Sequence, residues 1–225
     1  MKYNYRAMNK KSLESYFLEH VIPEVNRSRL SDSRKNSLSL SPREHLGLVL
    51  LSYLFRELNK RQYSPAINPD LSDDGCVYDF KDNKMFEVEQ VYIYEDKWDQ
   101  KNQEGILNAL KSKSASNKQY SAHTTLLIFC NAIGTIYLNE INSYITSSKF
   151  KTIILFAPTG DIEYEFNACI LKDDGKLINA CYKLAVSTIT GKATIKEIAA
   201  EIANNVNENP VIEANRECHR SSTAS

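Results

Sequence analysis

The chain has 225 residues, of which 42% are apolar, and its 28 basic side chains balance its 28 acidic ones. This mixture predicts one substantial globular domain with attachments, while only 7 Gly and 6 Pro exclude collagen-like and Pro-rich sequences. No apolar run approaches the roughly 18 residues that span a bilayer, so we expect no membrane partner. The five cysteines lie far apart without a C-x-x-C spacing, which is typical of reduced thiols in a cytoplasmic protein.

The net charge of zero hides a pattern along the chain. Residues 64–104 carry 4 basic and 11 acidic side chains, whereas residues 1–63 carry 12 and 6, and residues 105–157 carry 5 and 1. An acidic block between basic segments fits a metal-binding centre with basic margins for a polyanion. Uneven decoration of an ordinary surface fits the same numbers.

The first half of the chain reads as two helices followed by strands. Apolar spacings of three and four predict a helix over 10–26, and a basic, Ser-rich loop follows over 27–40. Ser41 and Glu44 have the spacing of a capping box around Pro42, so a strong helix should run to about residue 59. Extended segments are then expected at 62–68, 76–80 and 85–94, the last two forming a hairpin.

The second half continues with alternating helices and strands. Nearly continuous apolar runs at 124–130 and 151–157 predict adjacent central strands that are buried on both faces. The remaining expected elements are helices over 96–114, 138–147 and 194–207 and a hairpin of strands 163–171 and 177–186. This order predicts an α/β fold with a central mixed sheet flanked by helices.

We divide the chain into four parts on this basis. An N-terminal helix and basic loop occupy 1–40, an α/β core occupies 41–157, and a hairpin and helix packed on the core occupy 158–207. The last part, 208–225, loses its pattern and is expected to be a frayed tail.

The residues most able to carry chemistry lie in the second arm of the expected hairpin. Side chains alternate along a strand, so Glu87 and Glu89 share one face while Phe86, Val88 and Gln90 share the other. Two like charges on one face repel each other unless solvent, a cation or a basic group compensates. We expect Asp79, across the turn, to add a third carboxylate, and clustered carboxylates suit Mg²⁺. A solvated strand face with ordinary acidic residues is the alternative.

These residues resemble the PD-(D/E)XK superfamily of restriction-endonuclease-like nucleases. The family core runs helix, three-stranded meander, helix, strand (α-β-β-β-α-β), which corresponds to residues 42–130, about half of this chain. Its motif is an Asp in one hairpin arm followed by (Asp/Glu)-x-Lys in the next. Asp79 with Glu87-Val88-Glu89 is similar to that pattern, and Asp70, after Pro69, is a second candidate for the first Asp.

One position departs from the family motif. Glu89 stands where the family has Lys, as Glu or Gln does in some type II restriction enzymes. In another family variant the Lys comes from the following helix, and here Lys113 falls on the inward face of that expected helix.

The resemblance implies phosphodiester hydrolysis by a metal-activated water. Asp79 and Glu87 would hold Mg²⁺ or Mn²⁺, and Glu89 would be a further ligand or would orient the water. Glu44 would supply a metal ligand from the first helix, while Glu57, Asp70 and Gln90 are supporting or alternative site residues.

Nucleic acid is then the expected partner, with DNA the favoured substrate of a restriction- or defence-type endonuclease, although no residue pattern here distinguishes DNA from RNA. A homodimer is compatible with this function. We expect the basic segments 27–35 and 111–118 to border the acidic cleft. Two alternatives stay open: a catalytically silent nuclease-like module that binds nucleic acid or protein, and an unrelated α/β interaction protein.

Overall fold

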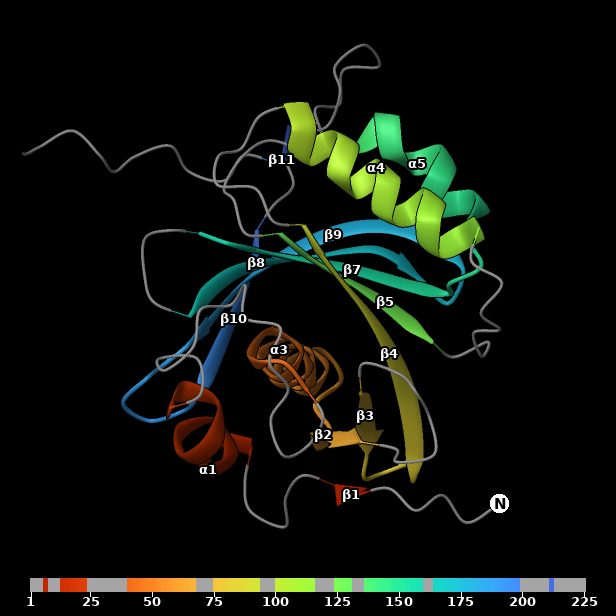
Figure 1. The fold of residues 1–225 in the computed structure, drawn as a ribbon. Coiled ribbons are helices and arrows are strands. Elements are labelled where there is room, and N and C mark those ends of the chain that lie inside the picture. The colour runs from red at the N-terminus through yellow and green to blue at the C-terminus, as the bar shows by residue number, and fades with distance from the viewer. Residues whose placement is uncertain are drawn as a thin grey trace, which may run out of the picture.

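One curled sheet organises the chain. The computed structural model describes residues 6–7, 13–23, 40–67, 75–93, 100–115, 124–130, 136–159, 164–198 and 211–212. Nine strands pair in the order β1-β2-β3-β4-β5-β7-β8-β9-β10, and Figure 1 shows them wrapped around helix α3, with α4 and α5 side by side on the opposite face. The predicted α/β class, with a mixed sheet and helices on both faces, is confirmed.

The elements have the following bounds. The sheet contains β1 (Arg6–Ala7), β2 (Tyr63–Ile67), β3 (Cys76–Asp79), β4 (Lys84–Ile93), β5 (Thr125–Cys130), β7 (Thr152–Pro158), β8 (Glu165–Asp173), β9 (Lys176–Val186) and β10 (Ala193–Ile198). The helices are α1 (Leu13–Tyr16), its π-helical continuation η1 (Phe17–Val21), α3 (Pro42–Asn59), α4 (Gln100–Ala115) and α5 (Leu138–Ser147). A separate short ladder joins β6 (Ile136–Tyr137) to β11 (Val211–Ile212).

The connections divide the sheet into three regions. Strands β2, β3 and β4 form an antiparallel meander, and β7 to β10 form a second antiparallel series. Between them, β4, β5 and β7 are parallel, and α4 and α5 make the two crossovers. The predicted adjacency of the runs at 124–130 and 151–157 is confirmed, because β5 pairs with β7 and all six residues of β5 are buried.

Helix α3 begins as its sequence predicts. The Ser41 hydroxyl accepts a hydrogen bond from the Glu44 amide at 3.3 Å, and the Glu44 carboxylate accepts one from the Ser41 amide at 2.6 Å, which completes the capping box. Every side chain from Glu44 to Leu54 is buried, rather than a single stripe. The curled sheet covers one side of the helix and Phe17 of η1 packs on another, edge-on to Tyr53.

The sheet separates two apolar layers. The first, on the side that we call the α3 face, includes Val88, Leu127 and Ile154 together with the buried side of α3. The second, on the α4 face, includes Ile93 and Leu126 with apolar residues of α4 and α5. Even-numbered residues of β4 therefore face α3 and odd-numbered ones face α4.

The prediction of a helix over 194–207 is wrong for the residues that the structure describes there. Residues 193–198 form β10, which pairs with β9 so that Ala193 lies opposite Val186. Ala193 and Ile195 pack on the α3-face layer while Thr194 and Lys196 are exposed, an alternation that suits a strand. The apolar spacing also fitted a helix, and pairing with an adjacent strand decided the outcome.

Several predictions concern residues outside the described ranges. The expected N-terminal helix is confirmed from Leu13 through Val21, but most of the basic loop lies outside those ranges. Within the expected tail, only Val211 and Ile212 are described, and they form β11. No helix in the described part of the chain is both long enough and apolar enough to cross a bilayer.

Candidate functional site

Strand β4 carries the two carboxylates that the sequence singled out. Glu87 and Glu89 both lie on the α4 face, as the alternation predicts, because Val91 and Ile93 of the same parity pack in the layer beneath α4. Glu89 is 4% exposed and Glu87 is half-buried. Two acidic side chains therefore lie together on a covered face, where a compensating cation matters more than on an open surface.

Lys113 supplies such a cation from the helix above. Its ammonium donates a hydrogen bond to Glu89 Oε1 and forms an ion pair with it. The Lys113 side chain is 28% exposed and that of Glu89 is 6% exposed, so the pair lies at the border of the core. Lys113 is in the last turn of α4, and its inward position agrees with the helical spacing that made it a candidate.

Glu87 has a different partner. The Thr124 hydroxyl donates a hydrogen bond to Glu87 Oε2 at 2.9 Å, from the residue that directly precedes β5. The parallel register explains the contact, because Val88 lies beside Thr125 and the preceding residues on both strands point to the α4 face. Thr124 could not be identified from the sequence, since no local spacing reveals which residues of two parallel strands are neighbours.

The structure does not bring Asp79 together with Glu87, which corrects the expected joint ligand pair. Across the hairpin, Asp79 lies opposite Lys84 and Cys76 lies opposite Glu87. Opposed residues share a face, and Asp79 is three positions from Cys76, so its side chain points to the α3 face while Glu87 points to the α4 face.

Asp79 instead stabilises the turn of the hairpin. Its carboxylate is 1% exposed and accepts hydrogen bonds from the Lys81 amide at 2.8 Å and the Asp82 amide at 3.4 Å, and Arg61 lies 3.4 Å away. Burial acts to raise the pKa of Asp79, but these donors, with the Tyr63 hydroxyl, outweigh it and hold the pKa below its ordinary value. An aspartate with this set of donors is a turn residue.

Glu44 and Gln90 lie on the α3 face, so they do not join Glu87 either. The Glu44 carboxylate caps α3 and lies 3.8 Å from the Arg43 guanidinium. Gln90 donates from Nε2 to the Glu44 carbonyl oxygen at 3.0 Å, which ties the start of α3 to β4. Both residues position the helix against the sheet.

Two further expected residues have other positions. Glu57 lies near the end of α3, where it accepts a hydrogen bond from Arg56 Nε at 3.1 Å and pairs with Lys60 at 3.4 Å. Asp70, the second candidate for the first acid of the motif, lies outside the described residues.

The residues present fit only a small metal site. Glu87 and Glu89 offer two carboxylates on one face, and Mg²⁺ is commonly held by one or two carboxylates together with water and substrate phosphate. Among the described residues, no group of three or more His, Cys, Asp or Glu side chains could hold a metal ion. Counting only these described residues, a cation at Glu87 would have two protein carboxylates, and water or substrate phosphate would supply further ligands.

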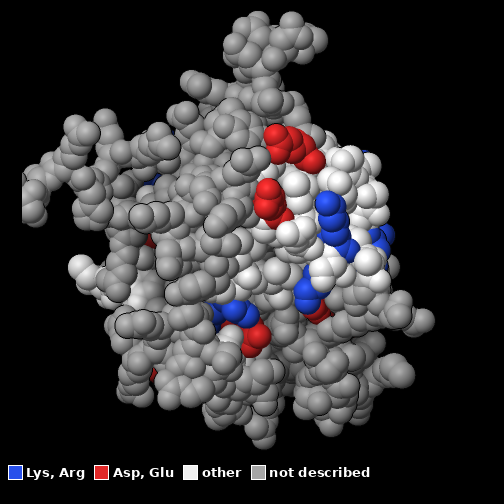
Figure 2. Space-filling view, turned by 45° about the horizontal axis from the view of Figure 1, so that its top comes forward, with Lys and Arg blue, Asp and Glu red and all other residues white. Residues whose placement is uncertain are grey.

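The structure describes only part of the basic segments that were expected to border the site. Residues 27–35 and 116–118 lie outside the described ranges, while Lys111 of α4 is exposed and its ammonium lies 4.9 Å from the centre of the Tyr144 ring. In the view of Figure 2, acidic and basic side chains of the described residues are intermixed. The basic border of the site stays a prediction.

Comparisons with protein-family models, with curated proteins and with solved structures found no match to this chain.

Proposed function

We propose that this protein is a metal-dependent phosphodiesterase related to the restriction-endonuclease-like nucleases, acting on nucleic acid, with DNA as the favoured substrate. The observation that carries the proposal is the ion pair of Lys113 with Glu89, beside Glu87 on one strand face. A lysine from the following helix thereby reaches the position next to the motif carboxylates. The succession of α3, β2, β3, β4, α4 and β5, with β4 and β5 parallel, supports the same assignment.

In this proposal Glu87 is the metal ligand. The hydrogen bond from Thr124 orients the carboxylate of Glu87 through Oε2, and Glu87 so oriented would hold the metal. When bound, Mg²⁺ would supply an activated water and would neutralise charge on the reacting phosphate. Thr124 is then a positioning residue, because it holds Glu87 in one orientation.

Lys113 and Glu89 act as a unit in the proposed site. The ammonium of Lys113 compensates one of the two carboxylates, so that a divalent cation and an anionic phosphate can approach together. Glu89 is expected to hold the ammonium of Lys113 in place and to orient the attacking water by accepting a hydrogen bond from it. A phosphate oxygen near Lys113 would be stabilised more strongly as its charge increases.

Substitution Glu87→Gln tests the proposal. The amide keeps the shape of the side chain but loses the charge, so Mg²⁺-dependent cleavage of DNA should disappear while the fold persists. Wild-type protein at a Mg²⁺ concentration about 100 times its Kd should melt roughly 5 to 10 °C higher than without metal, and Glu87→Gln should lose this rise. Glu104→Gln, at an exposed position of α4, is the matched control.

A catalytically silent nucleic-acid-binding module is the second candidate function. Two observations favour it: Glu89 replaces the motif lysine and already pairs with Lys113, and Asp79 faces away from Glu87. This function predicts salt-dependent binding of nucleic acid without cleavage and without a metal-induced rise in melting temperature. Cleavage that depends on Glu87 would exclude it.

A further inference from the structure

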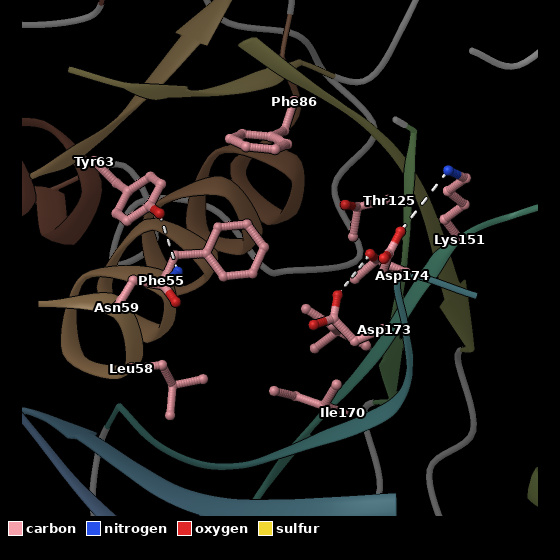
Figure 3. A pocket seen from close by; sticks show the side chains of 12 residues that line it. Phe55, Leu58, Asn59, Tyr63, Phe86, Thr125, Lys151, Ile170, Asp173 and Asp174 are labelled. Atoms are coloured by element: carbon pink, nitrogen blue, oxygen red, sulfur yellow. Dashed lines mark hydrogen bonds and ion pairs between the residues drawn. The ribbon is translucent and has the colours of Figure 1, made fainter. Parts of the chain in front are cut away.

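A second feature lies on the opposite side of the same strands. A cavity of about 250 Å³ opens between the end of α3 and the beginnings of β5 and β7. Figure 3 shows Phe55, Leu58 and Phe86 on one side of it and Thr125, Ile170 and Asp173 on the other. We call the edge of the sheet where β5 and β7 begin the rim.

One wall of the cavity is aromatic. Phe55 lies between Tyr63 and Phe86, with ring centres 5.6 Å and 6.2 Å away and with both neighbouring rings tilted against it. The Tyr63 hydroxyl accepts a hydrogen bond from Asn59 at 3.0 Å, which holds that ring in place. Such a wall favours a flat, aromatic ligand, because apolar contact and ring-to-ring interaction add together.

The opposite wall is polar and acidic. Thr152 donates to Asp173 Oδ1 at 3.0 Å, and the other carboxylate oxygen points into the cavity (Figure 3). Asp174 and Lys151 lie 3.8 Å apart at the mouth and offset each other, while Asp173 is exposed and lies opposite Lys176 in the ladder of β8 and β9. An ionised carboxylate accepts hydrogen bonds and donates none, so the ligand should present N–H groups to Asp173.

These walls select a planar heterocycle with an amino group, which is the chemistry of an adenine, cytosine or guanine base. The volume is below the usual range for drug-sized ligands and therefore favours a single ring system over a large molecule.

The cavity and the carboxylate site meet at the rim. Phe86 lines the cavity and Glu87 follows it on β4, while Thr125 lines the cavity and Thr124 precedes it. Consecutive Cα atoms are about 3.8 Å apart and their side chains point to opposite faces, so the two sites are back to back. A single strand of nucleic acid that crosses the rim would place one base in the cavity on the α3 face and a phosphodiester group near Glu87.

We propose that the cavity between α3 and the rim holds one unpaired base of a nucleic-acid strand, stacked on Phe55 and hydrogen-bonded to Asp173. The inference rests on the proposed function for its substrate, and it specifies that the substrate has an unstacked base. It predicts preference for single-stranded or distorted nucleic acid over regular duplex.

The experiment measures binding of short single strands in EDTA, where no metal-dependent cleavage occurs. An oligo-dA or oligo-dC strand should bind at least about tenfold more tightly than an abasic strand of the same length and charge. Phe55→Leu and Asp173→Asn should each remove most of this difference. Phe80→Leu and Glu140→Gln are the matched controls, at an exposed ring and an exposed carboxylate outside the cavity.

The outcomes separate this inference from the proposed function. Equal affinity for the base-containing and abasic strands, or a base preference that survives both cavity substitutions, overturns the base site, even if the protein cleaves DNA through Glu87. A base preference that depends on Phe55 and Asp173 without any cleavage supports the base site and overturns the nuclease. Tighter binding of a free nucleoside monophosphate than of an oligonucleotide would overturn a strand as the ligand, because it would identify a nucleotide site.

Discussion

The ion pair of Lys113 with Glu89 allows a prediction about both stability and metal binding. Lys113→Met takes the Lys113 ammonium away from the Glu89 carboxylate, whose side chain is 6% exposed and lies on the same face as Glu87. Breaking a buried pair costs about 3 to 5 kcal/mol, and the partial exposure of Lys113 places this case at the lower end, about 3 kcal/mol. For a chain of this length that corresponds to a fall of roughly 6 to 12 °C in melting temperature.

Removing the other partner of the ion pair should lower the free energy of unfolding by less. In Glu89→Gln the remaining ammonium belongs to a side chain that is 28% exposed, so it can turn to water, and we expect a loss of about 1 kcal/mol. The double variant Lys113→Met with Glu89→Gln should be more stable than Lys113→Met alone, because it also removes the buried charge that has lost the Lys113 ammonium. Lys111→Met, at an exposed position of the same helix, controls for the loss of a lysine from α4.

The assay is thermal unfolding with and without Mg²⁺. If the carboxylates form a metal site, Lys113→Met should increase the Mg²⁺-induced rise in melting temperature while it decreases cleavage, because the cation then replaces the ammonium. The reasoning would be refuted by a Lys113→Met protein as stable as wild type, or by a Glu89→Gln protein that is the less stable of the two. If Mg²⁺ raises the melting temperature of wild type and Lys113→Met by the same amount, the ion pair of Lys113 with Glu89 has only a structural role.

Three further predictions concern residues outside the carboxylate site. The hydrogen-bond donors around Asp79 hold its pKa low, so the contribution of Asp79 to stability is present above about pH 4 and is lost as the pH falls through the folded-state pKa. In measurements of unfolding against pH, Asp79→Asn should therefore reduce the loss of stability in acid, and it should leave the Mg²⁺ response unchanged. Lys172 is 4% exposed and donates to three carbonyl oxygens around the end of α5, so Lys172→Met should cost about 1 to 3 kcal/mol in chemical denaturation. Gly191 has a φ of 67°, and an added Cβ would lie 2.8 Å from the Glu14 carbonyl oxygen, so Gly191→Ala should lower the melting temperature by several degrees; an unchanged value would contradict this packing.

The sequence specifies the elements whose signals are local. The capping box at Ser41 and Glu44 predicts the start of α3, and the nearly continuous apolar run at 124–130 predicts a buried strand, because each signal depends only on neighbouring residues. The strand β10 was missed because its apolar spacing fits both a helix and a strand. Its pairing with β9 across the turn at 187–192 is a tertiary contact that no local pattern contains.

The candidate site divides in the same way. Alternation within one strand places Glu87 beside Glu89, and helical spacing places Lys113 on the inward side of α4, so those residues could be found from the sequence. The Thr124 contact with Glu87 depends on the register between β4 and β5, which is fixed by the packing of both strands and the helices that cover them.

The hairpin shows how strongly one residue of register affects an inferred site. Asp79 and Glu87 are an even number of positions apart and would share a face in an uninterrupted strand, but residues 80–83 turn the chain so that Asp79 lies opposite Lys84. A shift of one residue would exchange the faces and bring Asp79 toward Glu87. On β3 the positions that do share the face of Glu87 hold Cys76 and Tyr78, neither of which is a ligand for Mg²⁺. Within the described part of the chain, the proposed chemistry at Glu87 draws on Glu89 and Lys113, with Thr124 holding Glu87, so the response of the Lys113 variant to Mg²⁺ tests this site directly.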